Sequence, residues 1–170
     1  IEKVLDKLYE FQKQDFYNLF KDMSGKQIII RLLDLPLHEF LPTKDKDIEI
    51  LAKDMNMDFS EVKNIVESLK EFNPMLGHRG CRLGMTNPEI YRMQAKAIIS
   101  AVIQVEKEKN MSITPEIMIP LVGIENEIEV IRQHISEVAD EIIKRENSNM
   151  KYMVGTMIEI PRAALLADKI

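Results

Sequence analysis

Two segments carry charged residues where strands are expected to end, and they supply the first candidates for chemistry. Arg79 lies within residues 73–83 and Glu159 within residues 152–162, and each segment begins with residues that suit a strand and leads into a helix-like stretch. Arg31 interrupts an otherwise continuously apolar segment. Strand ends carry the catalytic side chains of βα folds. We therefore expect these charges to face a ligand.

The composition limits what that ligand can be. The chain has 170 residues, 45% hydrophobic and 30% charged, which is ordinary for a globular protein with a core. Its formal net charge of −5 argues against broad binding to nucleic acid or to an anionic membrane, so any anion site must be local. No apolar run approaches the roughly 20 residues that span a bilayer. The single cysteine, Cys81, excludes an intrachain disulfide and suits a cytoplasmic location.

The elements that must position these charges follow from the hydrophobic pattern. Strands are expected near residues 27–33, 74–76, 116–121 and 151–158. Helices are expected over residues 4–20, after Asn87-Pro88, over residues 125–144 and from Pro161 onward. A helical insertion with Ser60 as its N-cap separates the first two strands. Gly123 is expected to form the tight exit from the third strand.

This alternation predicts an α/β fold with a parallel sheet. No Gly-x-Gly-x-x-Gly follows the first strand and no P-loop occurs, so a nucleotide-binding Rossmann fold loses support. A complete (β/α)8 barrel takes about 250 residues, and four strands would make half of one. We therefore expect residues 1–170 to be a fragment of a single, partial (β/α)8 TIM barrel. The start at Ile1 and the end within an apparent helix agree with a piece of a longer chain.

Three ordered motifs resemble one enzyme family. They are residues 31–42, 73–83 and 155–164, and the similarity runs over essentially the whole chain. Together they resemble the C-terminal phosphoenolpyruvate/pyruvate-binding barrel of pyruvate, phosphate dikinases. Phosphoenolpyruvate synthase and Enzyme I of the sugar phosphotransferase system share the Asn-Pro-x-x-Gly-x-Arg core and the Met-Ile-Glu strand, whereas other stretches look specifically dikinase-like.

The resemblance implies that Arg31 and Arg79 are the two arginines that bind substrate and act in catalysis. Phosphoenolpyruvate carries a phosphate and a carboxylate, and guanidinium groups bind both bidentately while staying charged. Fixed cations also stabilise the negative charge that spreads over the phosphoryl oxygens in the transition state. The alternative for Arg31 is a strand-edge ion pair with Asp34 or Glu39. Arg82 is not assigned to the site.

Glu159 matches the family's ligand for Mg²⁺, the implied cofactor. Mg²⁺ prefers oxygen ligands and takes one or two carboxylates together with substrate oxygens. Pairing with Arg162 is the alternative role for Glu159. The family supplies a second ligand, an Asp, and a catalytic cysteine from later strands that this sequence does not contain. Cys81 does not match that cysteine and is expected to be a small buried residue.

The implied function is one half-reaction of a dikinase, in which a phosphohistidine on another domain and pyruvate exchange a phosphoryl group. None of His38, His78 and His134 is a candidate for that phosphohistidine. A fragment of phosphoenolpyruvate synthase and a non-catalytic structural or assembly module are the alternatives. The isolated chain is expected to lack dikinase turnover. We also expect a homo-oligomer, because a half-barrel leaves strand edges and an apolar face uncovered.

Overall fold

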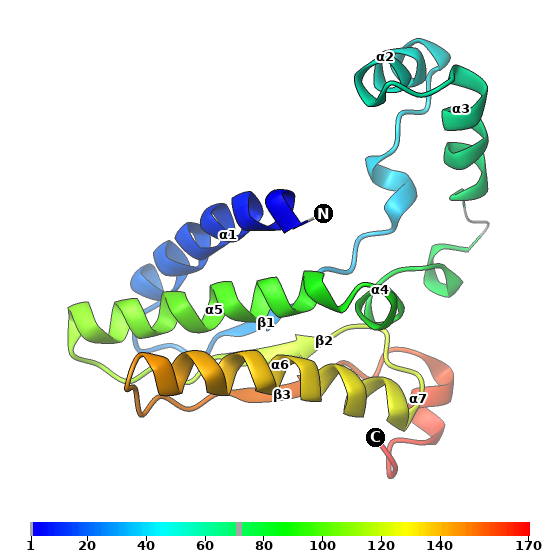
Figure 1. The fold of residues 1–170 in the computed structure, drawn as a ribbon. Helices are drawn as coiled ribbons and strands as arrows, with labels where there is room; N and C mark the ends of the chain where they lie inside the picture. Colours follow the sequence, from blue (N-terminus) through cyan, green and yellow to red (C-terminus); the bar gives the residue numbers. More distant parts are fainter. Residues whose placement is uncertain (1, 71–72) are drawn as a thin grey trace. The chain divides into compact units, whose positions relative to one another are not determined.

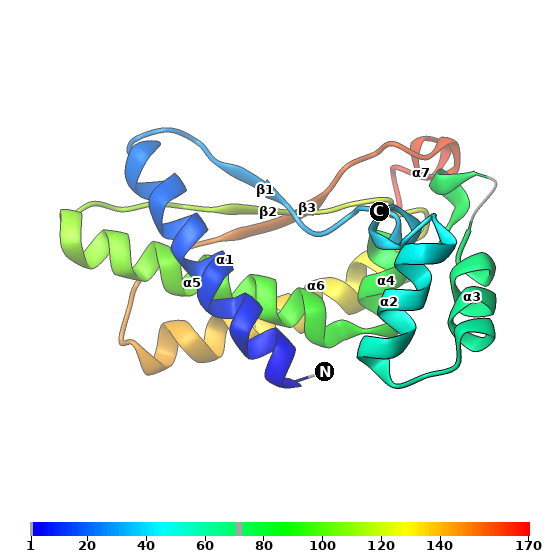
Figure 2. The ribbon, with the colours of Figure 1, turned by 90° about the horizontal axis from the view of Figure 1, so that it is seen from above.

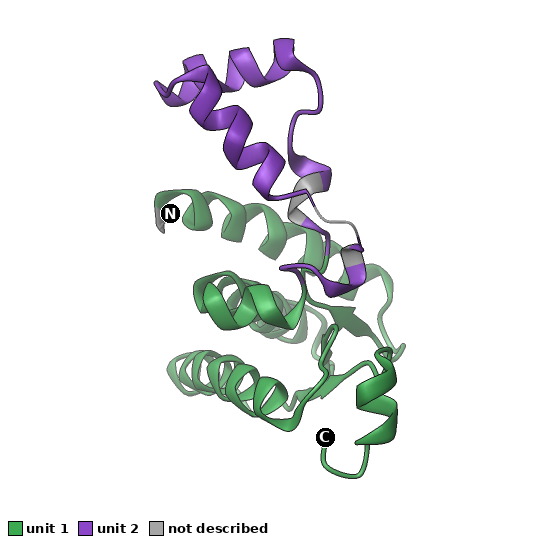
Figure 3. Cartoon of the chain, turned by 90° about the vertical axis from the view of Figure 1, so that its right-hand side faces the viewer, with its two compact units in different colours: residues 1–34, 80–170 green, residues 35–79 purple. Residues whose placement is uncertain are grey.

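In the computed structural model, residues 2–70 and 73–170 are described, and the chain divides into two compact units (Figure 3). The first unit consists of residues 1–34 together with residues 80–170, and the second of residues 35–79. The second unit is therefore inserted into the first along the chain, where the sequence predicts a helical insertion. That the whole chain belongs to a single barrel domain stays a prediction.

The first unit is built on a parallel sheet of three strands. β1 (Ile29–Arg31), β2 (Glu116–Ile119) and β3 (Met153–Thr156) pair in chain order, with Ile30 opposite Ile117. All three lie where the sequence predicts strands. The predicted α/β class with a parallel sheet is thereby confirmed.

The prediction of a strand at Pro74–Leu76 is wrong, because this segment forms a short 3-10 helix, η2. A proline has no N–H to donate to a strand ladder. The Asn73 side chain accepts the Met75 N–H at 3.0 Å, and the Leu76 N–H donates to the Asn73 carbonyl at 3.0 Å. Leu76 is 75% exposed, so no core holds the segment extended. Local hydrogen bonds replace the expected ladder.

Helices α1 (Glu2–Asp22), α5 (Pro88–Lys109) and α6 (Glu125–Arg145) cover one face of the sheet (Figures 1 and 2). Two shorter helices, α4 (Cys81–Thr86) and α7 (Pro161–Leu165), complete this unit. The sequence predicts all of these except α4, whose 6 residues are too few to show a helical periodicity. Within the described ranges, no helix is long and apolar enough to cross a membrane.

The hydrophobic core lies between the sheet and these helices. The strands contribute Ile30, Ile117 and Ile119, none of them more than 7% exposed. Helix α5 is buried on almost every side because it packs against both α1 and α6. Its buried residues are Tyr91, Met93, Gln94, Ala95, Ala97, Ile98, Ile99, Ala101, Val102, Ile103 and Val105. The other face of the sheet is open, and Ile29 and Met153 on it are each 52% exposed.

The second unit is a small helical insertion. It contains the 3-10 segments η1 (Leu37–Phe40) and η2, and the helices α2 (Asp45–Met55) and α3 (Phe59–Ser68). Its own core consists of Ile48, Ala52, Val62 and Val66.

The N-cap of α3 differs from the prediction of Ser60. Asp58 occupies that position, and its carboxylate accepts the Ser60 N–H at 2.8 Å. A carboxylate satisfies an unpaired N–H of the first turn and also opposes the positive end of the helix dipole. The helix therefore begins earlier than Ser60 suggests.

Candidate functional site

The structure brings Arg31 and Glu159 together at the carboxyl ends of the parallel strands. Arg31 is the last residue of β1, and Glu159 follows the end of β3. The Arg31 Nη2 atom lies 3.1 Å from both carboxylate oxygens of Glu159, across 128 positions of sequence. Arg79 is the last residue of the other unit, and the structure does not place it relative to this pair.

Asp34 is a third member of the cluster. The same Nη2 atom of Arg31 donates to the Asp34 carboxylate, so the strand-edge ion pair considered as an alternative is present beside the contact with Glu159. No ion pair joins Glu159 to Arg162 in the described part of the chain. The Arg31 side chain is 38% exposed, whereas those of Asp34 and Glu159 are only 10% and 19% exposed. Two largely buried carboxylates therefore share one guanidinium.

The residues that follow β2 also contact this cluster. The Leu121 N–H donates to Glu159 Oε1 at 2.9 Å and fixes the orientation of that carboxylate. Leu121 has φ 61, a left-handed conformation that is unfavourable for a leucine and costs of order 1–3 kcal/mol. The sequence predicts the tight exit at Gly123 instead, and this prediction is wrong because Gly123 is not one of the left-handed residues.

Cys81 holds the strained turn at Leu121 in place. Its N–H donates to the Pro120 carbonyl at 3.1 Å, and its thiol donates to the Leu121 carbonyl at 3.2 Å. Cys81 is fully buried, as expected, and burial raises the pKa of the thiol to about 12. A thiol that stays protonated at neutral pH is a poor nucleophile. Cys81 thus has a structural role in this unit.

Two buried side chains of α5 hold the loop that follows Arg31. The Tyr91 hydroxyl donates to the Leu33 carbonyl at 2.8 Å, and the Leu33 N–H donates to Gln94 Oε1 at 2.9 Å. Burial raises the pKa of Tyr91, so the hydroxyl remains a donor. Both hydrogen-bonding groups of Leu33 are thereby satisfied by the core, which restricts where Arg31 and Asp34 can lie. Gln94 is not among the residues predicted for the site, although an amide inside the apolar stripe of a helix is a detectable signal in the sequence.

Replacing Gln94 with methionine is expected to destabilise the chain by about 1–3 kcal/mol, because the Leu33 N–H would be left buried without an acceptor. Methionine has nearly the same shape, so little packing is lost. Gln133→Met on the exposed side of α6 makes the same chemical change without a buried partner and should cost less than about 0.5 kcal/mol. Urea denaturation measures both, and equal effects would mean that the Gln94 amide is dispensable.

The histidines contribute little to this cluster. His78 is exposed and belongs to the second unit, and the side chain of His38 lies outside the described part of the structure. His134 on α6 has a buried Nδ1 atom with no hydrogen-bond partner among the described residues. That none of the three is the phosphohistidine stays a prediction.

The oxygen atoms of Glu159 and Asp34 suit a magnesium ion. Two carboxylates surround one guanidinium, so the cluster of Arg31, Asp34 and Glu159 carries an excess negative charge. In the described part of the chain, no group of three or more His, Cys, Asp or Glu side chains is positioned to hold a metal. Mg²⁺ does not require such a group, because it accepts one or two carboxylates with substrate oxygens and water. The residues present therefore fit part of a magnesium site.

Comparison with known proteins defines the class to which this fold and site belong. Residues 2–170 match the phosphoenolpyruvate-binding domain that characterises the family of phosphoenolpyruvate-utilising enzymes, and the chain belongs to this family. The resemblance inferred from the sequence motifs is thereby confirmed.

Three proteins to which the chain is similar are pyruvate, phosphate dikinases. The dikinase of Clostridium symbiosum is 49% identical over 169 residues, which are 99% of this chain and 19% of that protein. The dikinase of Rhizobium meliloti (strain 1021) is 49% identical over 166 residues, 98% of this chain and 18% of that protein. The dikinase of Giardia intestinalis is 49% identical over 167 residues, 98% of this chain and 19% of that protein. The chain thus spans about a fifth of the length of these relatives.

Proposed function

We propose that this chain is the phosphoenolpyruvate- and pyruvate-binding part of a pyruvate, phosphate dikinase. The observation that carries the proposal is the contact of Arg31 with Glu159 at the carboxyl ends of parallel strands, in a chain of the phosphoenolpyruvate-utilising family. We further propose that the α/β fold of this chain is a partial (β/α)8 barrel, in which this edge of the sheet forms part of the catalytic face.

In this proposal, Arg31 and Arg79 bind the negatively charged groups of the substrate. Their guanidinium forks match the geometry of phosphate and carboxylate oxygens, and they keep their charge while the phosphoryl group moves between a phosphohistidine of another domain and the enol oxygen of pyruvate. Glu159, held by the Leu121 N–H, would be the ligand of Mg²⁺. The metal, when bound, would act as a Lewis acid at the enolate oxygen.

The contacts of Arg31 support this assignment of roles. Arg31 forms ion pairs with both Asp34 and Glu159, so its guanidinium is held at the ends of the strands by two carboxylates. Glu159 would hold the metal, and Arg31 would direct its donors to the phosphoryl oxygens of the substrate. Asp34, next to the loop that Tyr91 and Gln94 hold, would keep the Arg31 side chain in place.

The experiment that tests this function is Glu159→Gln in the intact dikinase that we propose contains this chain. The amide oxygen can still accept the Leu121 N–H, so the fold should be retained, but the charged ligand is lost. We expect the apparent affinity for Mg²⁺ in the pyruvate half-reaction to fall by at least about tenfold. Single-turnover rates at increasing Mg²⁺ concentration measure this.

The matched control is Glu116→Gln at the amino end of β2, where the carboxylate accepts a hydrogen bond from Gln27. This change removes the same charge from the same sheet and should leave the Mg²⁺ dependence unaltered. A Glu159→Gln enzyme with an unchanged Mg²⁺ dependence would remove Glu159 from the metal site. Self-association of the isolated chain and a cytoplasmic location stay predictions.

A further inference from the structure

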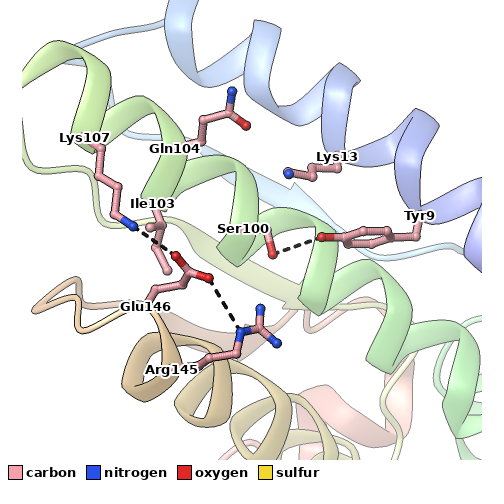
Figure 4. A pocket seen from close by; sticks show the side chains of 8 residues that line it. All are labelled: Tyr9, Lys13, Ser100, Ile103, Gln104, Lys107, Arg145 and Glu146. Atoms are coloured by element: carbon pink, nitrogen blue, oxygen red, sulfur yellow. Dashed lines mark hydrogen bonds and ion pairs between the residues drawn. The ribbon is translucent and has the colours of Figure 1, made fainter.

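A cavity of about 240 Å³ lies among α1, α5 and the end of α6, all within the first unit (Figure 4). It is remote from the cluster of Arg31 and Glu159 for a topological reason. Helix α6 leaves the carboxyl end of β2 and returns to the amino end of β3, so its last residue, Arg145, lies toward the opposite end of the sheet. No role proposed above uses this cavity.

The cavity is lined by three cations from three different helices. They are Lys13 of α1, Lys107 of α5 and Arg145 of α6, and a single carboxylate, Glu146, accompanies them. This excess of positive charge stands out in a chain whose formal net charge is −5. A local concentration of cations on an acidic protein favours a small anion over an extended anionic surface.

The cations differ in how they are neutralised. Lys107 Nζ lies 2.9 Å from Glu146, and Arg145 Nε lies 3.5 Å from the same carboxylate (Figure 4). Lys13 has no hydrogen-bond or ion-pair partner among the described residues. One carboxylate therefore neutralises two cations, and the third cation, Lys13, has no counter-ion in the part of the chain that the structure describes.

The neutral part of the lining is held in a fixed arrangement. The Tyr9 hydroxyl donates to Ser100 Oγ at 3.3 Å and links α1 to α5 beside Lys13. The Lys96 ammonium stacks over the Tyr9 ring at 4.4 Å and adds positive charge next to the cavity. The wall between the two helices is thus ordered by contacts of its own, so its shape does not depend on an occupant.

We propose that this cavity binds the phosphate group of a small anion. Its volume is below the range of about 300–1,000 Å³ that is usual for drug-sized ligands, and it suits inorganic phosphate or a small phosphate monoester. Ammonium and guanidinium groups are the side chains that recognise phosphate oxygens. Since Lys107 and Arg145 are each more than half exposed, binding is expected to be weak, in about the millimolar range. The site is independent of the proposed function.

Substitution of Glu146 is expected to change the affinity for phosphate in the opposite direction from substitution of a cation. Its hydrogen bond with Lys107 holds the pKa of Glu146 below its usual range, so the carboxylate is ionised and competes with an incoming anion. Removing that charge should strengthen phosphate binding, whereas removing a cation should weaken it. A residue that mattered only for packing would not show these opposite effects.

The test is a titration of the ¹⁵N-labelled chain with inorganic phosphate, followed by amide chemical shifts, at ionic strength matched with chloride. We expect saturable shifts around residues 100–107 and 145–146. Lys13→Gln and Arg145→Gln should each weaken phosphate binding by about tenfold, and Glu146→Gln should tighten it severalfold. Lys7→Gln, which removes the same charge from an exposed position of α1 outside the cavity, is the control and should change nothing.

Methyl phosphate distinguishes the two sources of the ligand. If it binds as well as inorganic phosphate, the site accepts phosphate monoesters, and if only inorganic phosphate binds, the site is specific for the free ion. Shifts confined to the strand ends around Arg31, shifts that chloride reproduces, or tighter binding in Lys13→Gln would overturn the proposal. The melting temperature of each variant with and without phosphate provides a second measurement that does not depend on assigned spectra.

Discussion

Replacing Arg79 with lysine in the intact dikinase is expected to slow the pyruvate half-reaction by about 10²–10³-fold, roughly 3–4 kcal/mol. Lysine keeps the charge and most of the stem, so the long-range attraction for phosphoenolpyruvate survives. It loses the planar fork, and with it the bidentate contact to a phosphoryl group whose charge is being redistributed. Arg79 directly precedes Gly80 in the chain, and its place in the site is part of the proposed function.

The deciding measurement is the single-turnover rate, taken together with a denaturant melt of the same variant. Arg92→Lys is the matched control, because Arg92 forms an exposed ion pair with Glu137 at 2.8 Å on the helical side of the molecule. It should leave turnover unchanged and cost less than about 1 kcal/mol of stability. Near-normal turnover in Arg79→Lys, or an effect confined to stability, would show that Arg79 is a structural residue.

Replacing Gly80 with alanine is expected to lower the free energy of unfolding by about 2–5 kcal/mol. Gly80 has φ 56 and ψ −133, a conformation that side-chain-bearing residues rarely adopt. A Cβ atom there would lie 2.9 Å from Asp34 Oδ1 and 3.0 Å from Leu121 Cδ1. Both neighbours are fixed, Leu121 by burial and by Cys81, and Asp34 by its contact with Arg31, so backbone strain and overpacking add.

Gly155→Ala is the matched control for this change. Gly155 lies in β3 without a positive φ, and a Cβ atom there would meet nothing within 4 Å. Alanine should therefore be tolerated and should stabilise the strand by up to about 1 kcal/mol, since it loses less conformational entropy on folding. Urea denaturation of both variants would contradict the argument if Gly80→Ala proved as stable as Gly155→Ala.

The positions of the elements could be predicted from the sequence because the signals are local. The stripe of apolar residues over residues 125–144 predicts α6, and Pro88 marks the start of α5, since helical periodicity and N-terminal preference depend on neighbours within a few residues. The same local evidence singled out Glu159, because a charge that follows an apolar strand is recognisable without its partner, whereas Arg31 was assigned to the site through the resemblance to the dikinase barrel. Where the local evidence was ambiguous, as at Pro74–Leu76, the prediction was wrong.

What the sequence by itself determined is therefore the α/β class, the parallel sheet, the positions of β1, β2 and β3, and the helices α1, α5, α6 and α7. Only the tertiary structure decided that Arg31 meets Glu159 across 128 positions, that Asp34 shares the same guanidinium, and that the left-handed turn falls at Leu121. Each of these depends on which strand ends lie side by side. Strand pairing joins segments far apart in the chain through burial and backbone hydrogen bonds, and no spacing within one segment encodes the partner.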